Sequence, residues 1–272
     1  MIAPTMATFI TSDEVRLAYR VDDFTDPWLD PGTPVLMLHA AMGNYRRWYA
    51  WTPLIARQHV TVSLELRGHG GSEIPAPEKP FSLERLVQDA RELLDNLGVA
   101  KAHVVGLSAG GYVGQRLAME SPDRVATLSL IASTPGLLGT QASTWPERIG
   151  KVGIEAFVRA TATDRFGDDA NPAMVDWFCR QVGRNDPAWV GRFVTHMASR
   201  DWTDELPRIA CPTLMLAPGH EPIGDHRIYE VMQRGIPDAT LITFDGMPHN
   251  IGDAAPVRCA EEVLRFIAAQ RT

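Results

Sequence analysis

The chain has 272 residues, of which 45% are hydrophobic and 22% are charged, and this is the composition of an ordinary globular protein. Its formal net charge of −7, with scattered basic residues, excludes the clustered positive charge that nucleic acids and anionic membranes attract. No apolar run approaches the roughly eighteen residues that span a bilayer, and the N-terminus lacks the basic and apolar segments of a signal peptide.

The 3 cysteines, Cys179, Cys211 and Cys259, are odd in number and far apart. This pattern argues against a disulfide framework or a metal site. We therefore expect a cytoplasmic protein with no metal site, and with neither nucleic acid nor membrane as a partner. The sequence leaves open whether the protein is a monomer or a homodimer.

Short apolar runs along the chain predict strands. In chain order the expected strands are residues 7–11, 15–21, 35–38, 60–66, 102–107, 125–132, 212–217 and 240–244. The first two flank a polar turn, Ser12-Asp13-Glu14, and predict an N-terminal hairpin. The next two are continuous apolar runs, which are typical of strands buried on both faces.

Helix-like stretches lie between most of these runs. The clearest begins after Ser82, where apolar residues recur with a period of about 3.6 and Gly98 can end the helix. Further helices are expected around residues 48–55, from 109 to about 120 and from about 254 to 269. The alternation predicts an α/β fold, with a mostly parallel central sheet flanked by helices on both faces.

The alternation stops after the sixth expected strand. Residues 135–208 hold large apolar side chains at helical spacing and no convincing strand. We expect them to form a helical cap inserted into a core made of residues 1–134 and 209–272. The aromatic cap residues that could line a pocket are Trp177, Phe178 and Trp189. The same spacing is also typical of residues that only pack a cap.

Residues 106–110, Gly-Leu-Ser-Ala-Gly, join an apolar strand to a helix. In a Gly-x-Ser-x-Gly turn the serine, here Ser108, stands on a sharp bend, and the glycines are needed because side chains would collide across it. The serine also lies at a helix N-terminus, whose free N–H groups favour a developing oxyanion. The alternative is a glycine-rich loop in which the serine only caps the helix.

A nucleophilic serine requires a base, and an acid that orients the base. His249 is the candidate base because it lies in the loop after the last strand, and no other histidine follows that strand. The acid is expected in the loop after strand 212–217. Glu221 is the preferred acid there, and Asp225, which could instead cap the next helix, is the alternative.

Two backbone N–H groups are expected to form an oxyanion hole. One belongs to Ala109, directly after the serine, and the other to Ala41, in the loop after strand 35–38. Small neighbours in this loop allow the backbone to approach a substrate. Arg46, just beyond the loop, could hold a substrate carboxylate or could be an ordinary exposed arginine at a helix start.

Taken together, these motifs resemble the α/β-hydrolase superfamily over nearly the whole chain. HAAMGN stands where that family carries His-Gly-x-x-Gly, and LELRGHGGS where it carries Asp-x-Arg-Gly-His-Gly-x-Ser. GLSAGG, LAPGHEPI and GMPHN match the elbow, the acid loop and the histidine loop. Within the superfamily, the sequence is most similar to 3-oxoadipate enol-lactonase-like hydrolases. The resemblance implies the α/β-hydrolase fold with a helical cap.

The sequence departs from the family pattern at three positions. Glu221 replaces the usual Asp, Ala40 a usual Gly, and Glu65 the usual Asp before Arg-Gly-His-Gly. We expect the methyl group of Ala40 to lie close to the acyl pocket, where a glycine would leave more space. We expect the LELRGHGGS element to be a structural turn.

The predicted function is that of a cofactor-free serine hydrolase. Ser108 would attack a carbonyl carbon, His249 would take and return the proton, and Glu221 would hold the imidazole tautomer. The expected substrate is a small, partly apolar carboxylic ester or lactone, cleaved through an acyl-enzyme. An amide or C–C bond hydrolase on the same triad is the alternative. A receptor that binds a ligand on a hydrolase scaffold is the alternative from another class.

Overall fold

The computed structural model describes residues 6–79, 81–223 and 226–270. In these ranges the chain forms an eight-stranded sheet of order β1-β2-β4-β3-β5-β6-β7-β8. The strands are β1 (Ala7–Ile10), β2 (Arg16–Asp22), β3 (Val35–Leu38), β4 (Thr61–Leu64), β5 (Ala102–Leu107), β6 (Val125–Ile131), β7 (Thr213–Pro218) and β8 (Ala239–Phe244). β2 pairs antiparallel with β1 and β4, and all other neighbours are parallel. The predicted α/β fold with a mostly parallel sheet is confirmed.

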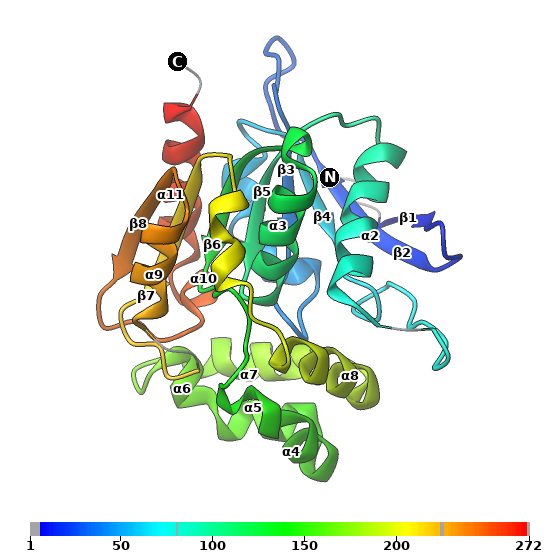
Figure 1. Cartoon of the computed structure of the whole chain (residues 1–272), viewed down its shortest axis with the longest axis vertical. Coiled ribbons are helices and arrows are strands. Elements are labelled where there is room, and N and C mark those ends of the chain that lie inside the picture. Colours follow the sequence, from blue (N-terminus) through cyan, green and yellow to red (C-terminus); the bar gives the residue numbers. More distant parts are fainter. Residues whose placement is uncertain (1–5, 80, 224–225, 271–272) are drawn as a thin grey trace.

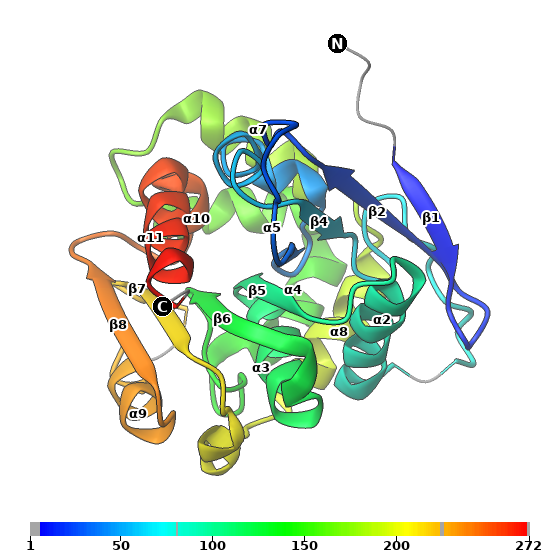
Figure 2. The ribbon, with the colours of Figure 1, turned by 90° about the horizontal axis from the view of Figure 1, so that it is seen from above.

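Helices cover both faces of this sheet. Viewed from above, α2, α3 and α9 lie on one side, and α10 and α11 lie on the other (Figure 2). The helices of the core are α1 (Thr52–Ile55), α2 (Leu83–Asn96), α3 (Ala109–Glu120), α9 (Ile228–Gly235), α10 (Ile251–Ala254) and α11 (Pro256–Ala269). α2 begins as predicted, because the Ser82 hydroxyl accepts a hydrogen bond of 3.1 Å from the Arg85 N–H.

Both faces of the central strands are apolar, so each strand contributes to two hydrophobic cores. In β3, Leu36 and Leu38 pack into the core beneath α2 and α3, whereas Val35 and Met37 pack into the core beneath α1 and α11. All four side chains are fully buried. This explains why β3 is a continuous apolar run in the sequence rather than an alternating one.

Five α-helices lie between β6 and β7, at the end of the sheet where β6 leads into them (Figure 1). They are α4 (Trp145–Val152), α5 (Ile154–Ala160), α6 (Ala162–Phe166), α7 (Pro172–Val182) and α8 (Pro187–Ala198). We call residues 135–208 the helical segment. Its two ends are tied together, since the Trp202 N–H donates to the Pro135 carbonyl at 3.0 Å and Gly136 bridges Asp201.

Across the described part of the chain, no helix is both long enough and apolar enough to pass through a membrane.

Candidate active site

The turn between β5 and α3 holds Ser108 in a backbone conformation with a φ of 46°, which non-glycine residues rarely adopt. Neighbouring glycines make this bend sterically accessible. A Cβ on Gly106 would lie 2.5 Å from Gly111 Cα, and a Cβ on Gly110 would lie 2.0 Å from the Leu38 carbonyl oxygen. The Gly-x-Ser-x-Gly pattern is therefore a requirement of the turn that presents the serine.

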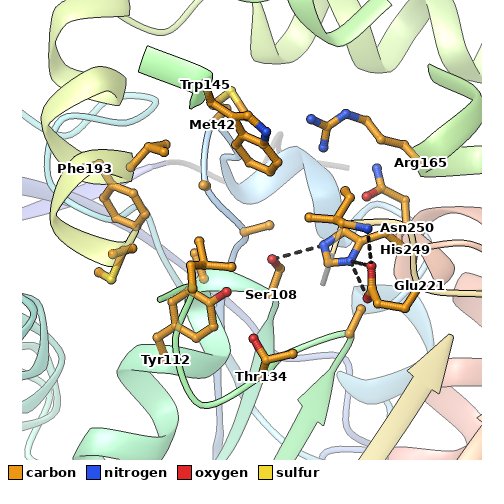
Figure 3. Close-up of a pocket in the computed structure, with 18 of the residues that line it drawn as sticks. Met42, Ser108, Tyr112, Thr134, Trp145, Arg165, Phe193, Glu221, His249 and Asn250 are labelled. Atoms are coloured by element: carbon orange, nitrogen blue, oxygen red, sulfur yellow. Dashed lines mark hydrogen bonds and ion pairs between the residues drawn. The ribbon is translucent and has the colours of Figure 1, made fainter. Parts of the chain in front are cut away.

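A chain of hydrogen bonds joins Ser108 to two residues that are distant in sequence (Figure 3). The Oγ of Ser108 lies 3.2 Å from Nε2 of His249. On the other side of the ring, Nδ1 lies 2.8 and 3.0 Å from the two carboxylate oxygens of Glu221. A proton on Nδ1 donates to this carboxylate and leaves Nε2 free to accept the serine hydroxyl.

The carboxylate of Glu221 is held from two further directions. The Ile223 N–H donates to Oε1 at 3.0 Å, and the Tyr229 hydroxyl donates to Oε2 at 3.2 Å. Burial and the Glu221 charge raise the pKa of Tyr229 well above its usual value, so this hydroxyl stays a donor. These contacts fix the acid against the imidazole. The alternative acid, Asp225, lies outside the described residues.

The loop after β3 places Ala41 beside the serine. Met42 has a φ of 62°, and the Gly43 N–H donates to the Ala40 carbonyl at 2.9 Å, which folds the loop into a tight turn. Ala41 and Ala109 both line the cavity with Ser108. As the first residue of α3, Ala109 has an N–H without a partner inside the helix.

The buried side chain of His39 contacts this loop. His39 Nδ1 lies 2.8 Å from the Ala40 carbonyl oxygen, and His39 Nε2 accepts from the Leu66 N–H at 3.0 Å. Burial, together with a smaller effect of nearby His69, lowers the pKa of His39 to about 3. The imidazole is therefore neutral, as an Nε2 acceptor must be.

The serine and histidine open into a small cavity of about 50 Å³ between the sheet and the helical segment. Its walls come from both parts of the chain. The sheet side contributes the elbow, the β3 loop, Tyr112 and Thr134, while the helical segment contributes mostly apolar side chains. The residues from the helical segment are Leu137, Trp145, Arg165, Phe178, Phe193, Val194 and Met197.

The structure does not bring every expected residue to this cavity. Phe178 lines it, but Arg46, Trp177 and Trp189 do not. Arg46 is exposed and lies over the Tyr45 ring, at 5.4 Å from its centroid. Neither tryptophan faces the serine, because each packs elsewhere.

Trp177 packs edge-on against Tyr49, at a centroid distance of 5.5 Å. Trp189 is an anchor between α8 and the core, since its Nε1–H donates to the Arg67 carbonyl at 2.9 Å. It leaves no room for a side chain at Gly68, where a Cβ would lie 2.0 Å from Trp189 Nε1. Helical spacing alone could not distinguish these roles from pocket lining.

The LELRGHGGS element forms a turn held by its own contacts. Buried Arg67 donates to Asp89 at 2.6 Å and to Asp13 at 2.9 Å. Glu65, the residue that departs from the family pattern, accepts hydrogen bonds from the Gly71 and Tyr45 N–H groups at 2.5 and 3.1 Å. None of these six residues lines the cavity.

Sequence reasoning did not single out Tyr112, Asn250 or Arg165, which all line the cavity. Tyr112 follows Ser108 by four residues on α3, so helical spacing could have placed it on the same face. Asn250 directly follows His249. Arg165 stands in a polar stretch of the helical segment, where nothing local distinguishes it from an exposed arginine.

Within the described residues, no three His, Cys, Asp or Glu side chains are grouped so that they could hold a metal ion.

Comparison with known proteins agrees with this architecture. The family described as alpha/beta hydrolase fold matches residues 33–162. The chain is 25% identical to 3-oxoadipate enol-lactonase 2 of Acinetobacter baylyi, over 79% of each protein. It is 36% identical to a fluoroacetate dehalogenase of a Burkholderia species over 38% of the chain, and this match spans only 35% of the dehalogenase.

Among solved structures, a hydrolase from Pseudomonas aeruginosa PA01 superimposes with a TM-score of 0.84. That protein is 28% identical, and the match covers 97% of this chain and 99% of the other. The fold, with an elbow serine between β5 and α3, defines an α/β hydrolase. The chain has the α/β-hydrolase fold and is similar in sequence to members of the α/β-hydrolase superfamily.

Proposed function

We propose that the protein is a serine hydrolase that cleaves a small carboxylic ester or lactone through an acyl-enzyme. The observation that carries this proposal is the chain of hydrogen bonds from Ser108 Oγ through His249 to Glu221. An isolated serine hydroxyl is a poor nucleophile, and a neutral imidazole within hydrogen-bond reach is the group that can accept its proton.

In the proposed reaction, the Ser108 oxygen bonds to the substrate carbonyl carbon while His249 accepts its proton. The N–H groups of Ala41 and Ala109 then stabilise the oxyanion, each by a factor of roughly 10² to 10³ in turnover. Protonated His249 returns the proton to the leaving alcohol, which departs and leaves the acyl group on the serine. Water, deprotonated by His249, releases the acid.

The first prediction tests the nucleophile. Ser108→Ala should abolish covalent labelling by a fluorophosphonate probe and the burst of 4-nitrophenol from a generic ester, because the attacking oxygen is gone. Ser129→Ala is the matched control, since Ser129 lies in the neighbouring strand β6 with its buried hydroxyl unpartnered among the described residues. The Ser129→Ala variant should be labelled to the same extent as the wild type. Labelling that persists in Ser108→Ala, or a wild type that neither labels nor turns over, would contradict the proposal.

A further inference from the structure

One arginine in the cavity wall has surroundings unlike those of the other buried arginines. Arg165 lies on α6, is only 5% exposed, and its side chain extends toward the cavity beside Asn250 and Trp145 (Figure 3). It therefore places a guanidinium group in the space that the serine and histidine share.

The other deeply buried arginines have carboxylate partners. Arg67 is paired with Asp89, and Arg47 is paired with Asp253. Arg165 differs, because the structure pairs it with no carboxylate in the described residues. Its one side-chain hydrogen bond there is from Nε to the Thr161 hydroxyl at 3.2 Å, and its guanidinium also lies 5.4 Å from the centroid of the Trp145 ring.

A buried cation without an ion-pair partner carries a desolvation cost. The Trp145 ring and the neighbouring, exposed Asp164 offset this cost only in part. Burial, together with the like charge of Arg47, lowers the pKa of Arg165 to about 10. The group is nevertheless still a cation near neutral pH. A bound anion would supply the missing partner, and the hydrogen bonds of such a pair are among the stronger ones in proteins.

A second unsatisfied polar group lies next to Arg165. The side-chain Nδ2 of Asn250 is buried and has no hydrogen-bond partner among the described residues. The Asn250 backbone N–H donates to the Arg165 carbonyl at 2.8 Å, which holds the two residues side by side. Because buried polar groups are normally hydrogen-bonded, two such groups at one cavity wall indicate a ligand that satisfies both.

We propose that Arg165 and Asn250 bind a carboxylate of the substrate, so that the preferred substrate is a short ester or lactone that also carries an acid group. This inference rests on the proposed function and names its substrate class. A planar carboxylate matches the donor fork of one guanidinium, with the amide as a further donor. The cavity of about 50 Å³ favours a short acyl chain between the carboxylate and the reacting carbonyl.

The proposal predicts a charge preference that one substitution removes. Monoethyl succinate and ethyl butyrate have similar acyl chains, but only the first is an anion. In the wild type, kcat/KM should be larger for monoethyl succinate than for ethyl butyrate. Ethanol release measures the hydrolysis of both substrates. In Arg165→Gln the ratio of the two kcat/KM values should fall by roughly 10- to 100-fold, which is the effect of losing a charged hydrogen-bond partner.

Arg148→Gln provides the matched control. Arg148 is exposed on α4, and its guanidinium lies 4.9 Å from the centroid of Phe157, a ring that Arg165 also approaches at 5.9 Å. The substitution removes the same charge from the same group of helices without touching the cavity. Its kcat/KM ratio should equal that of the wild type. An equal fall in both variants would mean that general electrostatics, rather than a site, sets the preference.

A binding measurement separates this inference from the proposed hydrolysis. Succinate should raise the melting temperature of the wild type but not that of Arg165→Gln, whereas butyramide should raise neither. If ethyl butyrate is hydrolysed but the charge preference and the succinate effect are both absent, the carboxylate site is wrong and the hydrolase proposal stands. If no ester is hydrolysed while succinate still stabilises the wild type through Arg165, the hydrolase proposal is wrong and the site stands.

Discussion

At the scale of single residues, the side chain of Glu221 is held in place by three neighbours. Its carboxylate touches His249 Nδ1, the Ile223 N–H and the Tyr229 hydroxyl. Glu221→Gln keeps the shape of the side chain, but it removes the charge that stabilises the imidazolium and allows the wrong tautomer. We predict that turnover falls by roughly 10² to 10⁴, as in other triads of this kind. Steady-state kinetics and the rate of fluorophosphonate labelling should fall together.

Asp225→Asn is the comparison for this prediction, because Asp225 is the other acid that the sequence offers in the same loop. It should leave turnover within about threefold of the wild type, since a carboxylate that does not orient the base contributes little to the barrier. A larger loss in Asp225→Asn than in Glu221→Gln would transfer the role of the acid to Asp225.

The sequence could point to some site residues and not to others for a physical reason. Ser108 and His249 lie in short local patterns at strand ends, and parallel strands bring such ends to one edge of the sheet. Arg165 reaches the cavity only through the packing of α6 against the core. The position of Arg165 at the cavity depends on tertiary contacts that no local sequence pattern encodes.

At the scale of elements, we propose that the helical segment sets substrate choice. Phe178 on α7 and Phe193 on α8 line the cavity, whereas Trp177 packs on Tyr49 outside it. Phe178→Leu and Phe193→Leu should each change the ratio of the kcat/KM values for a small and a bulky ester. The expected change is roughly 10- to 200-fold, which corresponds to 1 to 3 kcal/mol in the difference between the two activation free energies. A minimal acetyl ester, which does not reach these side chains, should be turned over at nearly the wild-type rate.

Trp177→Leu is the control for this effect, because it removes a neighbouring aromatic ring of the same helix that does not line the cavity. Its selectivity should match that of the wild type. Thermal melting of all three variants identifies losses that come from folding. Selectivity that stays constant in both phenylalanine variants would mean that the segment packs the fold without selecting the substrate.

Strand and helix positions in the core followed from the sequence because each has a clear local period. β5 and α3 begin and end close to the predicted residues, since an apolar run and a glycine-rich turn mark them. The helical segment was predicted only as a whole. Its division into α4, α5 and α6 depends on Gly153, with a φ of 79°, and on packing between short helices.

At the scale of the whole molecule, two buried histidines link the stability of the fold to pH. His39 joins the β3 loop to Leu66, and the His69 ring lies 5.3 Å from the His39 ring. Burial lowers the pKa of His39 to about 3 and that of His69 to about 4. Both are therefore neutral in the folded protein at pH values where an unfolded histidine, with a pKa near 6.5, binds a proton.

The unfolded state thus binds more protons than the folded state below pH 6.5, so the free energy of unfolding should fall as the pH falls toward 4. Each histidine contributes a loss of about 1 kcal/mol in the free energy of unfolding between pH 7.5 and 5.5.

The variant His69→Phe tests this contribution, because it keeps a ring in contact with Phe193 but cannot take up a proton. We predict that its stability, measured by urea unfolding, falls by about 1 kcal/mol less than that of the wild type over this interval. Between pH 7.5 and 8.5, where histidine is neutral in both states, the difference between the two proteins should stay constant. An equal acid loss in both proteins would contradict the assignment of a neutral, buried His69.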